Sequence, residues 1–160
     1  MDKPLDKIKL KNPVHLLAVG LGSGLLHPAP GTWGSLAALF IGTPLLMLLG
    51  IKGFLLFTLI CFVLGCYLCQ KTADDMGIHD HGAIVWDEFV GMFLVMAALP
   101  SLSWSWLLTA FVLFRLFDIF KPWPIRYFDQ KLESGFGIMI DDVLAASYGV
   151  LIVIMLRNLF

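Results

Sequence analysis

Long apolar stretches, interrupted by short polar segments, dominate this chain. Formal charge is absent from residues 89–114 and 143–156, and Lys52 is the only charged residue between positions 12 and 70. The pattern predicts five apolar helices, at residues 35–50, 53–69, 86–99, 103–117 and 143–159. Each is shorter than the ~20 residues that an upright helix needs to cross a bilayer. We therefore expect them to tilt, to extend into their polar flanks or to penetrate only partly.

The connections between these stretches indicate how the helices are arranged. The segment around Lys52 is too short for anything but a tight turn, so the first two helices should form a hairpin. Pro100 and Ser101 separate the third helix from the fourth. Residues 14–26 are apolar but glycine-rich, which suits a re-entrant or interfacial segment better than a full crossing. The expected fold is all-α: a single domain over residues 1–160, built as a polytopic membrane bundle of about four to five membrane helices.

Composition supports the membrane assignment. Apolar residues make up 59% of the chain and charged residues 14%, whereas soluble domains have about 45–50% and about 25%. A soluble chain of 160 residues could not bury this much apolar surface in one core. The net charge of −1 provides no electrostatic footprint for nucleic acid. The three cysteines, Cys61, Cys66 and Cys69, share one apolar stretch and so indicate neither a disulfide framework nor a zinc site.

The distribution of lysine and arginine predicts the orientation. If the N-terminus is cytoplasmic and all five helices cross, the loops after residues 69 and 117 are cytoplasmic as well. Eight cations then lie on the cytoplasmic side and two, Lys52 and Arg157, lie outside, as the positive-inside rule favours. The eight are Lys3, Lys7, Lys9, Lys11, Lys71, Lys121, Arg126 and Lys131. The polar motifs fall on the same side, which indicates a site at the cytoplasmic face.

The densest polar segment, residues 72–88, contains five carboxylates and two imidazoles. Clustered carboxylates repel one another and require protonation or a bound cation. Oxygen ligands suit Mg²⁺ or Mn²⁺, and imidazole would extend the choice to zinc. Asp87 and Glu88 could instead stabilise the N-terminal dipole of the third helix. We favour metal ligation for this pair, because acids placed where an apolar helix begins are costly near lipid.

The segment 115–126 carries three cations around one acid. Arg115, Asp118 and Lys121 are spaced three residues apart, so neighbours in this series share a helix face. They could form local ion pairs at the end of a span, with Lys121 and Arg126 snorkelling to the lipid headgroups. Alternatively, Asp118 joins a metal site while the three cations receive phosphate oxygens. The residues alone leave both interpretations open.

A second acidic pair, Asp141 and Asp142, directly precedes the last apolar stretch. Adjacent side chains on a helix point about 100° apart, so both acids could reach one metal only near a helix end. Stabilisation by the helix dipole is the alternative here too. Two acidic pairs at the cytoplasmic starts of two different helices are harder to explain by the dipole than one pair is.

Five motifs occur in order over residues 12–142. They are Asn12-Pro-Val-His-Leu-Leu-Ala-Val-Gly20, Pro30-Gly-Thr-Trp-Gly-Ser35, His79-Asp-His-Gly-Ala-Ile-Val-Trp-Asp-Glu88, Arg115-Leu-Phe-Asp-Ile-Phe-Lys-Pro-Trp-Pro-Ile125 and Gly137-Ile-Met-Ile-Asp-Asp142. Together they resemble the phosphatidylglycerophosphatase A family. The resemblance implies a Mg²⁺-dependent phospholipid phosphatase in the bacterial inner membrane. Such an enzyme would remove the terminal phosphate of phosphatidylglycerophosphate and yield phosphatidylglycerol.

With this resemblance, the polar residues acquire candidate roles. The candidate metal ligands are Asp80, Asp87, Glu88, Asp118, Asp141 and Asp142. The candidate phosphate-binding residues are Arg115, Lys121 and Arg126, and the candidate catalytic residues are His79, His81 and Asp80. A histidine would protonate the leaving alkoxide or deprotonate water. An aspartyl-phosphate intermediate is the rival mechanism within the enzyme class.

A divalent-cation transporter or channel is the alternative class of protein. Such a protein would carry carboxylates near the middle of its membrane helices. Here the acids occupy only the ends of the predicted helices, which favours an enzyme that acts at the membrane surface.

Overall fold

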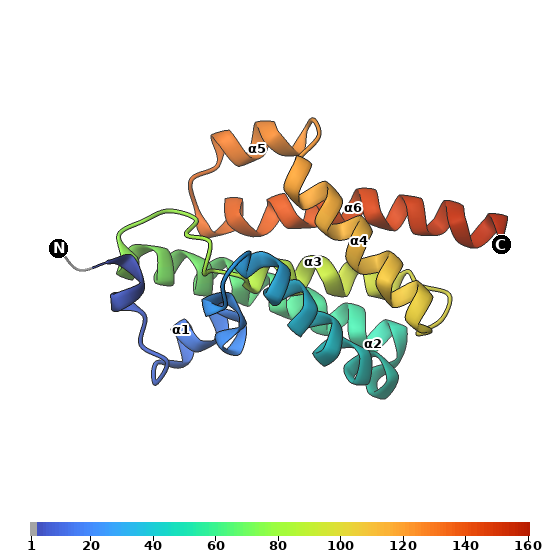
Figure 1. Ribbon diagram of the computed structural model, residues 1–160, viewed down its shortest axis with the longest axis horizontal. Coiled ribbons are helices and arrows are strands. Elements are labelled where there is room, and N and C mark those ends of the chain that lie inside the picture. The colour runs from blue at the N-terminus through green and yellow to red at the C-terminus, as the bar shows by residue number, and fades with distance from the viewer. Residues whose placement is uncertain (1–2) are drawn as a thin grey trace.

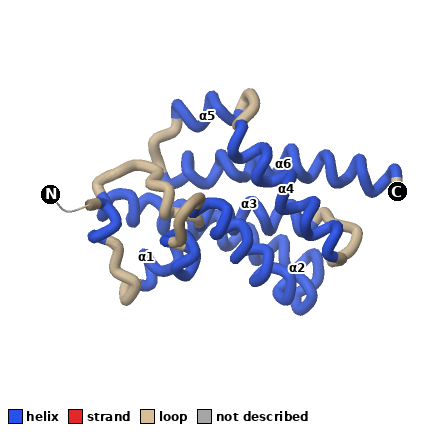
Figure 2. Tube along the Cα trace, viewed as in Figure 1, coloured by secondary structure: helices blue, strands red, loops and turns tan. Residues whose placement is uncertain are grey.

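Helices account for nearly all of the regular structure, as the apolar pattern predicted (Figure 2). The computed structural model describes residues 3–160, which form six α-helices, two short 3-10 helices and no strand. The α-helices are α1 (Pro13–Ala18), α2 (Pro30–Met76), α3 (Trp86–Ala97), α4 (Trp104–Phe120), α5 (Ile125–Lys131) and α6 (Gly135–Leu159). The 3-10 helices are η1 (Pro4–Lys7) and η2 (Gly20–Leu25). The prediction of an all-α fold is confirmed for the described residues.

The longest helix, α2, folds back on itself. Gly50 has non-helical backbone angles inside α2, with φ 68° and ψ 173°. Glycine adopts this conformation readily because it has no Cβ. Figure 1 shows the two halves of α2 running in opposite directions from this bend. This is the hairpin that the short link at Lys52 predicted, with the reversal at Gly50.

The helix α3 lies at the centre of the arrangement. Ten of its 12 residues are buried, because α2, α4 and α6 all pack against it. Phe93 of α3 packs against Phe54 of α2, with ring centroids 5.2 Å apart. On the side facing α4, a Cβ at Gly91 would overlap the ring of Phe114. The missing side chain at Gly91 therefore allows α4 to pack closely on the central helix.

Two helices within residues 3–160, α2 and α6, are long and apolar enough to span a membrane. With 12 and 17 residues, α3 and α4 are shorter than a typical bilayer core: about 18 Å and about 26 Å against about 30 Å. Large apolar side chains such as Met47, Leu48 and Leu151 are exposed on the outside of the molecule. Contiguous apolar surface of this kind is rare on soluble monomers and suits contact with lipid.

The N-terminal segment is too short to span a membrane. Its helices α1 and η2 have six residues each, and the backbone turns sharply inside η2, at Leu21 and Gly22, where φ is positive. Gly20 and Gly24 are buried, whereas Leu21 and Leu26 are exposed. The segment thus consists of two short helices with a sharp turn inside the second, and its re-entrant or interfacial placement stays a prediction.

Several helix boundaries differ from the expectation: α2 runs from Pro30 to Met76 instead of over residues 35–50 and 53–69, and α4 ends at Phe120 instead of residue 117. The helix α6 begins at Gly135 instead of residue 143, because Ser134 caps it by accepting a hydrogen bond from the Gly137 amide at 3.2 Å. Asp141 and Asp142 therefore lie in the second and third turns of α6, beyond the first turn where the helix dipole acts. The sequence reading also missed α5, whose seven residues bury only Ile125.

Polar segments gather toward one end of the molecule. Figure 1 shows the N-terminus, the connection between α2 and α3, and α5 toward one end of the long axis. The bend in α2, the connection between α3 and α4, and the C-terminus lie at the other end. The segments that contain the eight cations assigned to the cytoplasmic side therefore lie toward one end of the molecule. The segments that contain Lys52 and Arg157 lie toward the other end.

Candidate active site

Three buried carboxylates from two helices converge beside the central helix. Asp87 and Glu88 lie in the first turn of α3, and Asp142 lies on α6, which packs against α3. One oxygen of each side chain lies within 4.8 Å of the others. The three residues are only 7%, 9% and 2% exposed. We call Asp87, Glu88 and Asp142 the acidic cluster.

The acidic cluster has unsatisfied hydrogen-bonding capacity. One oxygen each of Asp87, Glu88 and Asp142 is buried without a hydrogen-bond partner among the described residues. Burying a carboxylate without a partner is strongly unfavourable, and three such groups also repel one another. Among the described residues, the acidic cluster offers only carboxylate ligands and includes no imidazole or thiolate. Such a donor set fits a hard divalent cation such as Mg²⁺ or Mn²⁺ better than zinc.

An arginine from α4 lies beside the acidic cluster. The guanidinium of Arg115 donates a hydrogen bond to Asp118, one turn further along α4, and its Nη1 lies 3.8 Å from Oε1 of Glu88. The Nε atom of Arg115 is buried and has no hydrogen-bond partner in the described part of the chain. Arg115 therefore connects two acids and still has a free donor.

The start of α2 closes over the pair formed by Arg115 and Glu88. A Cβ built on Gly31 would lie 2.8 Å from Oε1 of Glu88 and 3.1 Å from Nη1 of Arg115. Only glycine leaves room for these two side chains. The motif 30–35 thus contributes to the site through close packing, and the sequence reading did not assign Gly31 a role.

Lys121 links Asp118 of α4 to Asp129 of α5. This residue ends α4 with φ 45°, and its Nζ lies 3.5 Å from Oδ1 of Asp129 and 4.0 Å from Oδ1 of Asp118. Burial lowers the pKa of the Lys121 ammonium, but nearby carboxylates, Asp142 and Asp118 foremost, outweigh burial and raise the pKa above its ordinary value. Lys121 is therefore a permanent cation that faces acids.

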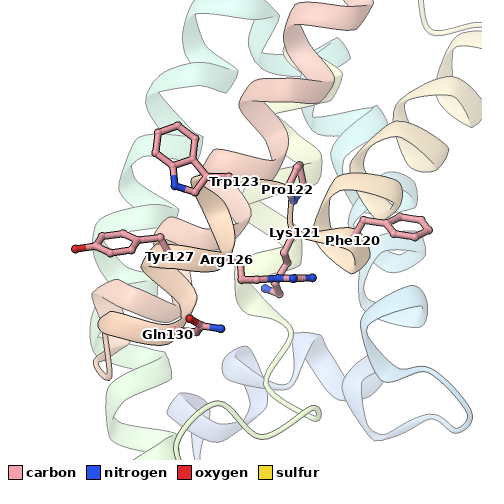
Figure 3. A pocket seen from close by; sticks show the side chains of 7 residues that line it. All are labelled: Phe120, Lys121, Pro122, Trp123, Arg126, Tyr127 and Gln130. Atoms are coloured by element: carbon pink, nitrogen blue, oxygen red, sulfur yellow. The ribbon is translucent and has the colours of Figure 1, made fainter.

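Arg126 lines a separate pocket at the junction of α4 and α5. The pocket has a volume of about 390 Å³ and is lined by Phe120, Lys121, Pro122, Trp123, Arg126, Tyr127 and Gln130. Figure 3 shows the side chains of Lys121 and Arg126 extending toward the same part of this pocket. Arg126 is exposed and forms no ion pair with any carboxylate in residues 3–160.

The other three predicted metal ligands lie around Lys121 and outside the acidic cluster. Asp118 is held by Arg115, and Asp141 is buried and contributes to the field at Lys121. Asp80 is exposed, with φ 51°, in the loop that leads into α3. It is close enough to Lys121 and Asp118 to interact with both electrostatically.

The predicted catalytic histidines lie outside the acidic cluster. His79 is exposed and lines a small pocket with Gln70 and Glu133. His81 is half-buried, and its Nδ1 accepts a hydrogen bond from the amide of Ala83 at 3.1 Å. Neutral His81 therefore carries its proton on Nε2.

Sequence reasoning did not identify the contacts that Asp129 and His15 make. Asp129 pairs with Lys121 because it lies on α5, a helix that the apolar pattern did not reveal. His15 is buried, and its Nε2 lies 2.9 Å from Oδ2 of Asp75. That contact ties α1 to the end of α2.

These features define a class of protein: an all-helical chain with apolar outer surfaces whose central helices bury a carboxylate cluster beside an arginine and a lysine. The family model described as phosphatidylglycerophosphatase A matches residues 16–157, and the chain belongs to this family. It is 72% identical to phosphatidylglycerophosphatase A of Haemophilus influenzae, over 95% of this chain and 93% of that protein. It is 50% identical to phosphatidylglycerophosphatase A of Escherichia coli, over 90% and 83% of the two chains. No solved structure matches.

Proposed function

We propose that this protein is a phosphoric monoester hydrolase that removes the terminal phosphate of phosphatidylglycerophosphate, yielding phosphatidylglycerol and phosphate. Membership of the family and the names of its relatives support this substrate. The observation that carries the proposal is the buried acidic cluster, which has unpartnered oxygens and in which Glu88 lies 3.8 Å from Arg115. Carboxylates and guanidinium groups together are suited to a bound cation and to a phosphate group.

The residues that would hold a divalent cation are Asp87, Glu88 and Asp142. A Mg²⁺ ion bound there would offset the negative charge of the acids and polarise a phosphate oxygen or a water molecule. Asp80, Asp118 and Asp141 remain candidates for further ligands, because all three lie near Lys121 and interact with it electrostatically. Mn²⁺ has similar ligand preferences and could replace Mg²⁺.

Cations beside the acidic cluster would position the terminal phosphate. Arg115 has an unpaired Nε donor, and its guanidinium is held in place by Asp118. Lys121 is fixed between Asp118 and Asp129. Both can donate charge-assisted hydrogen bonds to phosphate oxygens, and both would stabilise the charge that develops there in the transition state.

Proton transfer would fall to the loop before α3, which contains His79, Asp80 and His81. Neutral His81 has its hydrogen on Nε2 and could donate a hydrogen bond to a substrate oxygen, whereas protonation of the glycerol oxygen that leaves would require the imidazolium form. The rival mechanism forms an aspartyl phosphate on a carboxylate such as Asp80. Rapid acid quenching with radiolabelled substrate distinguishes the two, because only the rival mechanism leaves label on the protein.

The proposed location is the bacterial inner membrane, with several crossings and with the site facing the cytoplasm. The apolar helices, the exposed apolar surface and the gathering of cations at one end support it. A divalent-cation transporter is supported less well, because two of the three acids of the cluster lie in the first turn of α3, at one end of the helix.

Phosphate release by purified protein in detergent micelles tests the proposal. We expect release from phosphatidylglycerophosphate in the presence of Mg²⁺ and none in excess chelator. Metal flux into liposomes, measured on the same preparation, should be absent. Flux without phosphate release would favour the transporter, and full turnover in chelator would exclude the metal requirement.

A further inference from the structure

The cations near the acidic cluster differ in their partners. Arg115 and Lys121 are both held by carboxylates. Arg126 has no carboxylate partner in the described chain, yet its side chain extends into the same pocket as that of Lys121 (Figure 3). An unpaired arginine in a pocket that also contains aromatic side chains and a second cation is available for an anionic ligand.

Lys121 lines this pocket and also lies near carboxylates, with Asp118 at 4.0 Å and Asp142 foremost among the acids that raise its pKa. Trp123 is 80% exposed and Tyr127 is exposed as well. On the adjoining end of α4, Ile119 and Phe120 present exposed apolar side chains. Tryptophan and tyrosine favour the headgroup region of a bilayer, so the pocket has the composition of a surface that meets lipid headgroups.

The proposed substrate contains two phosphates in series. A phosphodiester joins diacylglycerol to a glycerol unit, and the terminal monoester lies at the far end of that glycerol. The acyl chains stay in the bilayer, so the lipid must approach the site from the lipid-facing surface of the helix bundle. When the monoester reaches the acidic cluster, the diester remains closer to the lipid-facing surface of the bundle.

We propose that Arg126 binds the phosphodiester of the same lipid molecule whose terminal phosphate is hydrolysed. Its planar guanidinium can donate two parallel hydrogen bonds to the two free oxygens of a diester. Arg126 is then a specificity-determining residue that distinguishes this lipid from phosphatidic acid, which has a monoester but no diester. The inference rests on the proposed function for the identity of the lipid.

The test compares two substrates with equal acyl chains, phosphatidylglycerophosphate and phosphatidic acid, in neutral detergent micelles with Mg²⁺. Arg126→Gln should lower kcat/KM for phosphatidylglycerophosphate about tenfold, which corresponds to one charge-assisted contact. The loss for phosphatidic acid should be smaller, so the preference for phosphatidylglycerophosphate falls. Arg126→Lys should retain part of that preference. Arg157→Gln, at the far end of α6, is the matched control and should retain it fully.

Other results would overturn the inference. Equal losses on both lipids would place Arg126 at the terminal phosphate, and no loss on either would exclude a phosphate contact. A loss that develops only after another phospholipid is added to the micelles would mean that a neighbouring lipid occupies the pocket.

A second measurement separates this inference from the proposed function. Binding of phosphatidylglycerol, which has the diester but no monoester, is followed by native mass spectrometry without turnover. If the wild-type protein hydrolyses neither substrate, the proposed function fails. In that case weaker phosphatidylglycerol binding by Arg126→Gln than by Arg157→Gln still supports a diester contact, and equal binding overturns it.

Discussion

At the scale of single residues, the acidic cluster combines burial with unsatisfied charge. Asp87, Glu88 and Asp142 each have a buried oxygen without a partner in the described chain. Groups that bind a ligand in the folded state alone stabilise the protein by mass action, by about 2.7 kcal/mol when the ligand is present at 100 times its Kd. Cation binding should therefore be visible in stability as well as in turnover.

Asp142→Asn should weaken both the stabilisation by Mg²⁺ and the turnover. We expect kcat to fall by about 100-fold or more, the scale for loss of a group that stabilises transition-state charge. In thermal melts, Mg²⁺ should raise the Tm of the wild-type protein and have little effect on the variant. Asp74→Asn is the control, because Asp74 is exposed and bonds only to Gln70. An unchanged Mg²⁺ response in Asp142→Asn would argue against cation binding at this cluster.

Gly31→Ala tests a site residue without changing its charge. The added methyl group would meet the flexible ends of Glu88 and Arg115, which can move at little cost in folding free energy. Their displacement should nevertheless lower kcat/KM about tenfold or more, because catalysis is sensitive to small misplacements. The Tm should change little.

Gly82→Ala is the matched control for this substitution. A Cβ at Gly82 meets no atom within 4 Å, so both Tm and kcat/KM should stay near the wild-type values. Wild-type kinetics in Gly31→Ala would show that the start of α2 does not constrain the site.

At the scale of elements, the connection from α4 to α5 determines where the cations lie. Lys121 ends α4 in a left-handed conformation, and the turn that follows brings Asp129 of α5 next to it. The apolar pattern could not reveal this contact, because α5 buries only Ile125 and so has no apolar face to detect. Charge spacing within α4 did predict the pairs of Asp118 with Arg115 and Lys121.

The acidic pairs show where sequence reasoning reached its limit. The position of Asp87 and Glu88 at the start of α3 was predicted, since the apolar stretch begins there. The predicted start of α6 was wrong, because the helix begins at Gly135, where Ser134 caps it, and so includes about two turns ahead of the predicted apolar stretch. That both Asp87 and Glu88 but only Asp142 of the second pair join the acidic cluster depends on the packing of α3 against α6. That information is absent from spacing along one chain.

Lys121→Met distinguishes phosphate binding from anchoring at the membrane surface. If Lys121 contacts phosphate, kcat/KM should fall by a factor that corresponds to a loss of about 2 kcal/mol of transition-state stabilisation. Inorganic phosphate should also inhibit the variant less than the parent. Tm, measured in parallel, should change much less than the rate. Equal catalytic efficiency and equal inhibition by phosphate would leave Lys121 with a structural role between Asp118 and Asp129.

At the scale of the whole molecule, charge and apolar surface are segregated along one axis. Many apolar side chains of α2 and α6 are exposed, and Figure 1 shows the loop before α3 and the helix α5 toward one end of the long axis. A lipid phosphatase needs this arrangement, because its substrate keeps its acyl chains in the bilayer and presents its phosphates at the surface. The excess of lysine and arginine at the same end predicts that this end faces the cytoplasm.

Site-directed labelling tests that orientation. Gly82→Cys is a suitable probe, because Gly82 is exposed and a side chain there meets no neighbouring atom. It should be introduced into a variant whose three native cysteines are replaced by alanine. A membrane-impermeant maleimide should label it in inverted vesicles and leave it unlabelled in intact spheroplasts. Lys52→Cys, near the bend of α2 at the opposite end, should show the reverse pattern. Exchange of the two patterns would invert the topology and place the acidic cluster on the outer side of the membrane, away from any substrate made in the cytoplasmic leaflet.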